Sequence, residues 1–215
     1  YEVVLVLDRD TPATVVREAE NLLGSRMRVV WFDGAFNFAE KMNRGVVASS
    51  GDVVVLLNDD VEIITPDWLE TMVGFIQDPS VGMVGTKLLF ADDTIQHAGH
   101  VYSAKSPFHP YRGFHKDFLG MARMLLVDRE CSGVTAACCA LRRSVWEEVG
   151  GMSEEFPNNF NDVDFSLKIR DRGYRIIWTP HVELYHFESM TRNPAVEREE
   201  IELLRLRWDN ELTVD

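Results

Sequence analysis

The sequence predicts an α/β protein with a single domain, in which helices flank a Rossmann-like mixed sheet. Short apolar runs alternate with helix-like segments through residues 1–60, an order typical of parallel βαβ units. Residues 53–57 are apolar and largely β-branched. They lead directly into Asn58-Asp59-Asp60, as expected where a buried strand ends at a ligand-binding edge. The length of 215 residues and the hydrophobic content of 46% suit one globular domain.

Three strands and two helices are expected in the N-terminal part of the chain, with the strands parallel in one sheet. Thr11 and Pro12 suit the N-cap and the first position of the first helix. Asn37, followed three residues later by Glu40, has the spacing of a capping box for the second helix. The expected strands are residues 3–7, 27–32 and 53–57, and the expected helices are residues 12–23 and 37–48.

The remaining sequence predicts further strands and helices around one irregular segment. Thr65 and Pro66 indicate another helix start. Residues 103–128 have no regular period and contain several prolines, glycines and aromatic residues, so we expect a substrate loop or lid there. Its aromatic residues could cover a substrate or pack the loop down, and packing is favoured for most of them. Residues 195–210 predict a C-terminal helix on the outside of the domain. The other expected strands are 81–90, 95–102, 134–141, 174–178 and 182–187, and the other helices are 144–149 and 161–171.

Charge and cysteine content exclude several classes of protein. The net charge of −13 argues against a nucleic-acid partner, because no basic excess is present to neutralise a phosphate backbone. Cys131, Cys138 and Cys139 suit buried reduced thiols, and their spacing is not that of a zinc site. No apolar run is long enough to span a membrane, and no signal peptide is visible. We therefore expect a cytoplasmic protein, and peripheral attachment to the inner face of the cell membrane stays open.

The stretch Asn58-Asp59-Asp60 is the first of three polar features in apolar surroundings. Two adjacent carboxylates repel each other, which favours a compensating divalent cation that also carries phosphate. The alternative is an ordinary surface turn with a helix cap, since Asn and Asp are common turn residues.

Asp162 and His186 are the other two. Asp162 stands at a helix start, where the helix dipole favours an ionised carboxylate that can take a proton from a hydroxyl nucleophile. The alternative for Asp162 is a plain N-cap. His186 ends a strand-like alternation, where a neutral imidazole can complete an oxygen-rich metal site. The alternative for His186 is a hydrogen-bonded structural histidine.

Nine sequence motifs occur in an order that resembles a known enzyme family. They are FNF at 36–38, LNDD at 57–60, TPDWLE at 65–70, VGTKLL at 84–89, TIQHAGH at 94–100, RRSVWEEVGG at 142–151, FNDVDF at 160–165, GYRIIWTP at 173–180 and LYHFES at 184–189. Together they resemble the family-2 glycosyltransferases, and look most like the rhamnosyltransferase-like bacterial branch that builds cell-surface polysaccharide. The resemblance covers most of the chain.

The resemblance implies a GT-A fold and inverting transfer of a sugar from a nucleoside-diphosphate sugar to a hydroxyl of a glycan or lipid-linked acceptor. It implies that Asp60 binds Mg²⁺ or Mn²⁺ on the diphosphate, and that His186 is a further metal ligand. Asn58 replaces the first Asp of the family's DxD-type motif, and Asp59 would lie near the ribose or the sugar. Asp162 matches the general base that activates the acceptor hydroxyl.

The chain departs from the family pattern at its beginning. Its first strand looks like the family's second strand, so residues 1–215 are expected to be a catalytic domain that lacks the first β-α unit. The tip of this strand is Leu7-Asp8-Arg9-Asp10-Thr11, where the family usually has an Asp-Asn-Gly-Ser-Thr type of sequence. By its position in the family pattern, Asp8 is expected to contact the nucleotide base.

Two other functions are compatible with parts of this sequence. A nucleotidyltransferase would share the α/β fold and the metal, but a Gly-rich phosphate loop with a basic residue near the N-terminus is not seen. A non-catalytic sugar-nucleotide-binding module is the other alternative, motivated by the missing first strand. Sugar choice depends on loop shapes that motif spacing does not determine.

Overall fold

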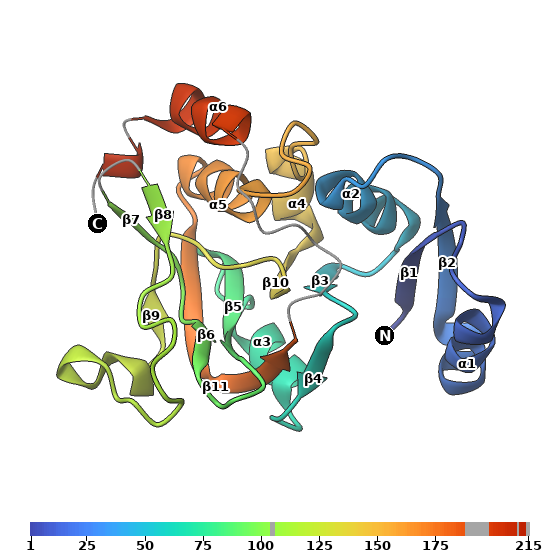
Figure 1. The fold of residues 1–215 in the computed structure, drawn as a ribbon, viewed down its shortest axis with the longest axis horizontal. Helices are drawn as coiled ribbons and strands as arrows, with labels where there is room; N and C mark the ends of the chain where they lie inside the picture. Colours follow the sequence, from blue (N-terminus) through green and yellow to red (C-terminus); the bar gives the residue numbers. More distant parts are fainter. Residues whose placement is uncertain (104–105, 188–197, 210, 214–215) are drawn as a thin grey trace.

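The computed structural model describes residues 1–103, 106–187, 198–209 and 211–213, and it has the expected α/β architecture (Figure 1). A seven-stranded mixed sheet forms the body of the molecule, and helices cover it. In spatial order its strands are β3 (Val53–Leu57), β10 (Cys138–Arg142), β5 (Val81–Leu89), β11 (Arg175–His186) and β4 (Val61–Ile63). Two short strands extend it: β6 (Ile95–His97) pairs with β5, and β9 (Arg129–Glu130) pairs with β11.

A second, smaller sheet contains only the first two strands. β1 (Val3–Asp8) pairs with β2 (Met27–Phe32) in parallel, and both lie to one side of β3 in Figure 1. Helix α1 (Ala13–Leu23) and the 3-10 turn η1 (Gly24–Arg26) connect them, and α2 (Phe38–Ala48) follows.

The prediction of three parallel strands in one sheet is therefore wrong. The ladder bonds of β3 go to β10, which is antiparallel and stands at the other side of β3 from β1. The partner of β3 comes from about eighty residues later in the chain, so the order of neighbouring elements contains no information about it.

Two apolar cores lie on opposite faces of the main sheet. All nine residues of β5 are buried, and adjacent residues point to opposite cores: Met83 to one and Val84 to the other. Helices α4 (Arg143–Val149) and α5 (Asn161–Asp171) contribute Trp146 and Phe165 to the first core. Helix α3 (Trp68–Phe75) covers the second face. Burial on both faces explains why β5 reads as an almost continuous apolar run.

Several element boundaries differ from the sequence prediction. The expected strand 95–102 is two strands, β6 and β7 (Val101–Ser103), the expected strand 134–141 begins only at Cys138, and Pro12 is the N-cap of α1 and not its first residue. Helix α3 begins at Trp68 and not at Pro66, because Thr65 is tied to β11: its hydroxyl accepts a hydrogen bond from Glu183 N at 3.0 Å. The expected strands 174–178 and 182–187 are one strand, β11, with a register shift between Thr179 and Glu183.

The expected cap at Asn37 is confirmed. Its side chain accepts a hydrogen bond from Glu40 N at 3.1 Å, which satisfies one of the free amides of α2. The Glu40 carboxylate pairs with Arg44 one turn later, so the reciprocal half of the capping box is replaced by an ion pair.

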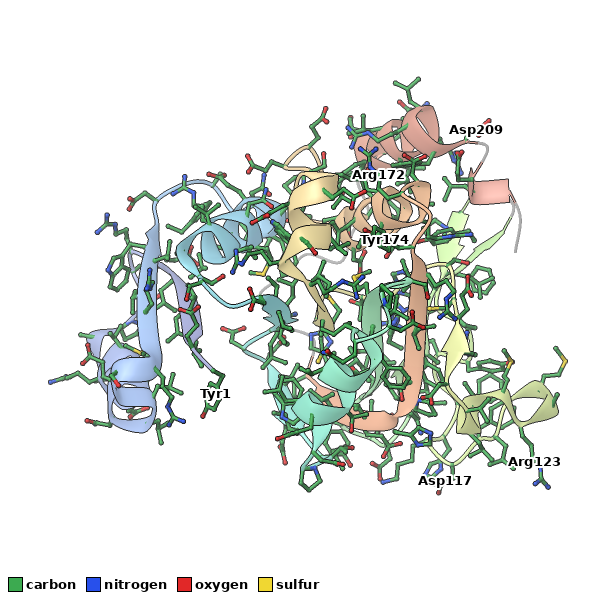
Figure 2. The ribbon with its side chains drawn as sticks, turned by 180° about the vertical axis from the view of Figure 1, so that it is seen from behind. Tyr1, Asp117, Arg123, Arg172, Tyr174 and Asp209 are labelled. Carbon is green, nitrogen blue, oxygen red and sulfur yellow. The ribbon has the colours of Figure 1, made fainter. Side chains whose placement is uncertain are left out.

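The described residues of segment 103–128 are more regular than the sequence suggests. Ser103 ends β7 (Val101–Ser103), which pairs in antiparallel with β8 (Ser106–Phe108), and the segment includes the 3-10 segment η2 (Met121–Leu126). Tyr111, Phe114 and Phe118 contact one another. Tyr111 packs against the first apolar core, whereas Phe114 and Phe118 are exposed. Figure 2 shows Arg123, in η2, at the opposite end of the molecule from Tyr1.

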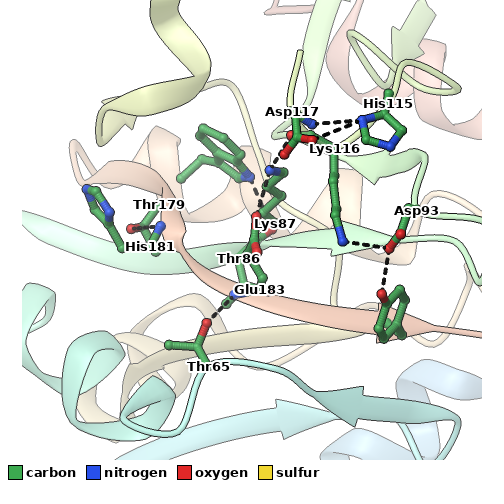
Figure 3. A network of polar contacts seen from close by, with 12 residues as sticks. Thr65, Thr86, Lys87, Asp93, His115, Lys116, Asp117, Thr179, His181 and Glu183 are labelled. Atoms are coloured by element: carbon green, nitrogen blue, oxygen red, sulfur yellow. Dashed lines mark hydrogen bonds and ion pairs between the residues drawn. The ribbon is translucent and has the colours of Figure 1, made fainter. Parts of the chain in front are cut away.

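A buried lysine anchors this segment to the sheet (Figure 3). Lys87 lies in β5 with only 6% of its surface exposed, and its ammonium group donates to the Glu183 carboxylate at 2.7 Å and to the Lys116 carbonyl at 2.8 Å. The Lys116 ammonium in turn pairs with Asp93 at 3.0 Å. A buried charge needs such partners. The hydrogen bond from Lys87 to the Lys116 carbonyl therefore holds the middle of segment 103–128 against β5.

The C-terminal helix is α6 (Arg198–Trp208), followed by the 3-10 turn η3 (Glu211–Thr213). Residues 195–197 and 210 of the predicted helix lie outside the described residues, as do residues 188 and 189 of the last motif. Helix α6 lies on α5, where Arg207 and Trp208 both donate to the buried carboxylate of Asp164.

Candidate functional site

Strand pairing brings Asp60 and His186 together. In the antiparallel ladder between β4 and β11, His186 lies opposite Val61, and Phe187 N donates to the Asp60 carbonyl at 2.9 Å. As a result the Asp60 carboxylate lies 3.1 Å from His186 Nε2. Both side chains are largely buried, with 21% of Asp60 and 13% of His186 exposed.

Gln96 determines the tautomer of His186. The Gln96 amide nitrogen donates to the His186 carbonyl at 3.2 Å, which orients its oxygen toward His186 Nδ1 at 2.7 Å. Nδ1 must therefore carry a proton, and in the neutral ring Nε2 has the free lone pair. Metal-ligating histidines usually have this arrangement, in which the second ring nitrogen donates to an oxygen of the protein.

These atoms could hold a divalent cation. The lone pair of His186 Nε2 and the negative charge of Asp60 face each other, an arrangement that favours a positive charge shared by both. Asn58 Nδ2 lies 3.2 Å from the same ring nitrogen. A carboxylate with an imidazole is a donor set that suits Mn²⁺, and the carboxylate suits Mg²⁺ as well.

The other two predicted donor contacts lie in different surroundings. The side chain of Asp59 is exposed beside Asp60, at the carboxyl end of β3. Asp8 ends β1 in the smaller sheet, and its carboxylate pairs with Lys41 at 2.7 Å. The Lys41 ammonium also lies 5.3 Å from the ring centres of Phe32 and Phe36, so this corner combines a cation with two aromatic faces.

Asp162 lies in the first turn of α5. One carboxylate oxygen accepts a hydrogen bond from Val163 N at 2.9 Å, and the other lies 4.0 Å from His100 Nε2. The helix cap is Phe160, which has a left-handed backbone, so the alternative of Asp162 as a plain N-cap is wrong.

Helix α6 holds the loop that precedes Asp162. The carboxylate of Glu200 is buried and accepts hydrogen bonds from Asn158 N at 3.2 Å and Asn159 N at 2.9 Å. The two acidic residues of the FNDVDF motif therefore have different surroundings. Asp164 is bound to Arg207 of α6, whereas 20% of the Asp162 side chain is exposed.

A cluster of three histidines beside Asp162 was not predicted from the sequence. His97, His100 and His109 each have their ring centre within about 5 Å of the other two, at 4.8 to 5.0 Å. The spacing of His97 and His100 was a visible signal, but His109 joins them only because β8, which it follows, pairs with β7. β6 links the two parts of the site, because Gln96 contacts His186 and its neighbour His97 contacts His109.

Burial lowers the pKa of all three histidines. The pKa of His109 falls to about 3, and those of His97 and His100 are also lowered; the first cause in each case is removal from water. Asp162 acts in the opposite direction on His100 and His109 without overcoming burial. All three rings are therefore neutral near pH 7.

We expect this cluster to make the protein sensitive to mild acid. A histidine in the unfolded chain titrates near pH 6.5. Below that pH the unfolded state therefore binds protons that the folded state does not bind, because the pKa of the buried histidine is lowered. The free energy of unfolding should fall as the pH is lowered from 6.5, by about 1.4 kcal/mol per pH unit for each histidine. Urea unfolding at pH 7.0, 6.0 and 5.5 measures this. His109→Gln should reduce the slope, and an unchanged slope would contradict the assignment.

Comparison with known proteins gives one family and several relatives. Residues 1–210 match the family model described as Glycosyltransferase like family 2. Among curated proteins, the chain is 37% identical to the uncharacterized protein y4gI of Sinorhizobium fredii, over 97% of this chain and 24% of that protein. It is 34% identical to the O-antigen biosynthesis protein RfbC of Myxococcus xanthus, over 89% of this chain and 15% of that protein. The chain thus spans about a quarter or less of the length of these two relatives.

Solved structures share the fold. GalNAc-T7, solved with UDP, GalNAc and Mn²⁺, superposes with a TM-score of 0.74 at 12% identity, over 98% of this chain and 43% of that one. The mannosyltransferase PcManGT from Pyrobaculum calidifontis, solved with GDP-Man and Mn²⁺, superposes with a TM-score of 0.60 at 22% identity, over 96% and 51% of the two chains.

Proposed function

The chain belongs to the glycosyltransferase-like family 2, and from this premise we propose that it transfers a sugar from a nucleoside-diphosphate sugar to a hydroxyl of a glycan or lipid-linked acceptor, with inversion. The observation that carries the proposal is the pairing of the Asp60 carboxylate with Nε2 of His186, at the carboxyl end of β3. Ligands of open α/β sheets gather at such strand ends.

The metal in this proposal is Mn²⁺ or Mg²⁺, held by Asp60 and His186. When bound, it offsets negative charge that develops on the leaving diphosphate. Two solved structures with this fold contain Mn²⁺ together with UDP or GDP-Man, which supports a metal-bound nucleotide here. Gln96 keeps His186 in the tautomer that the metal requires, and Asn58 lies beside the same nitrogen.

The protein residues divide the remaining tasks. Asp162 takes the proton of the acceptor hydroxyl, whose oxygen bonds to the anomeric carbon while the bond from that carbon to the diphosphate breaks. The nucleoside diphosphate leaves with the electrons of that bond, and one in-line displacement inverts the configuration. We assign Asp59 to the ribose or sugar of the donor, and Asp8 to the nucleotide base.

The biological setting is part of the proposal. The relative described as an O-antigen biosynthesis protein supports a polysaccharide acceptor of a bacterial cell envelope. Within the described residues, none of the helices has the length and apolar character needed to cross a membrane. We propose a cytoplasmic setting, with segment 103–128 contributing to acceptor contacts.

The test is turnover by the full-length protein. A panel of nucleoside-diphosphate sugars is incubated with Mn²⁺ and candidate acceptors, and release of nucleoside diphosphate is measured together with the glycosylated product. Release of inorganic diphosphate from a nucleoside triphosphate and a sugar phosphate would instead indicate a nucleotidyltransferase. Metal-dependent binding without turnover of any donor would indicate a binding module.

A further inference from the structure

The two ring nitrogens of His97 have partners of opposite kinds. The ring is buried, with 1% of its surface exposed. Nε2 faces two backbone amides, Gly99 N and Thr135 N, each at 3.2 Å. Both amides are donors, so Nε2 must be the nitrogen with the lone pair, and the proton of the neutral ring lies on Nδ1.

The tautomer of His97 determines that of His109. His97 Nδ1 lies 2.9 Å from His109 Nδ1, and since His97 carries the proton there, His109 accepts. A neutral His109 must then hold its own proton on Nε2, the other nitrogen of its ring. His109 is the only one of the three clustered histidines that is partly exposed.

His109 is connected to the carboxylate of Asp162 through His100. His100 Nε2 lies 4.0 Å from the Asp162 carboxylate, and the rings of His100 and His109 are 4.8 Å apart. Next to the helix start, the site thus offers a carboxylate that accepts and an imidazole N–H that donates. Neighbouring hydroxyls of a sugar present one donor and one acceptor in the same way.

We propose that His109 binds the acceptor sugar, donating from Nε2 to an oxygen next to the hydroxyl that Asp162 deprotonates, and that His97 is a positioning residue that sets the tautomer of His109. This inference rests on the proposed function. The acceptor class that it selects is a sugar with vicinal hydroxyls.

A metal site is the competing interpretation of the same three rings. Their nitrogens lie within 4.8 Å of one another, as three histidine ligands of a zinc ion could. The hydrogen bonds of His97 argue against this metal site. A metal on His97 Nδ1 would move the ring proton to Nε2, where it would face the amides of Gly99 and Thr135.

The first test measures the tautomers directly and does not depend on transfer. Long-range ¹⁵N–¹H spectra of the labelled protein at pH 7 should show His97 protonated on Nδ1 and His109 on Nε2, with peaks assigned by His97→Asn and His109→Gln. In His97→Ala, His109 should become a mixture of tautomers. Overturning results are His97 protonated on Nε2, or binding of one equivalent of Zn²⁺ that shifts all three rings.

The second test measures transfer with the best donor and a series of acceptors. His109→Ala should raise KM for the acceptor about tenfold and leave kcat within about twofold, because one hydrogen bond to bound acceptor is lost. His109→Gln, which keeps a donor at a similar place, should recover most of the loss. An acceptor lacking the neighbouring hydroxyl should bind wild type and His109→Ala equally.

The control is His181→Ala, whose ring is 59% exposed on β11 and should leave KM unchanged. If the wild type transfers sugar and His109→Ala has a normal KM for the acceptor, this inference is wrong while the proposed function stands. If the wild type turns over none of the donors, the proposed function itself fails, and the tautomer measurement still decides the geometry.

Discussion

Replacement of Asp162 by Asn should lower the rate of sugar transfer by a factor on the order of 10²–10⁴, the range expected for loss of a general base. Asparagine keeps the size of the side chain and an oxygen that can accept from Val163 N, so the helix start should be preserved. It cannot take a proton from the acceptor hydroxyl. Binding of Mn²⁺ and the nucleoside diphosphate, measured by calorimetry, should stay within about twofold, because these ligands contact Asp60 and not Asp162 in our proposal.

Asp171→Asn is the matched control for this prediction. Asp171 is the last residue of the same helix and is exposed, so the same loss of charge occurs one helix length from the site. Its transfer rate should equal that of the wild type. Transfer by Asp162→Asn at the wild-type rate would exclude Asp162 as the base, whatever the outcome for the metal site.

Replacement of Asp60 by Ala should abolish metal-dependent nucleotide binding. The substitution removes the carboxylate that faces His186 Nε2 at 3.1 Å, and with it the negative charge that holds the cation. We expect the Mn²⁺-dependent affinity for nucleoside diphosphate to fall about 100-fold or more. Replacing a residue that only hydrogen-bonds to a metal ligand already lowers metal affinity about 10- to 100-fold, and Asp60 is itself a proposed ligand. Calorimetry with UDP and GDP, with Mn²⁺ or with EDTA, measures the loss.

Two further variants make this result specific. Asp52→Ala removes an exposed carboxylate just before β3, at the opposite end of that strand from Asp60, and should bind nucleotide normally. Gln96→Leu should weaken metal binding about 10- to 100-fold, because His186 loses the acceptor that keeps its proton on Nδ1. Normal Mn²⁺-dependent binding by Asp60→Ala would show that the metal is held elsewhere.

Strand periodicity was a better guide to local structure than capping patterns, because Thr11 and Thr65 do not cap the helices that follow them. The strands at 27–32 and 53–57 occur where the sequence predicts them, and Asn37 caps α2 as its spacing with Glu40 indicated. The pairing of the strands was harder to predict than the strands themselves, because the hydrogen bonds between strands join residues far apart in the chain. That is why β3 was expected beside parallel strands and lies beside antiparallel β10.

The sequence by itself determined the α/β class, the run of carboxylates after β3 and the family to which the chain belongs, since each depends on residues close together in the chain or on motif order. The tertiary structure decided which side chains meet. Asp60 and His186 are adjacent because β4 and β11 pair, although 126 positions separate them. The tautomers of His186 and His97 depend on Gln96 and on two backbone amides. A proton position follows from the partners that surround a ring, and only the folded chain brings those partners together.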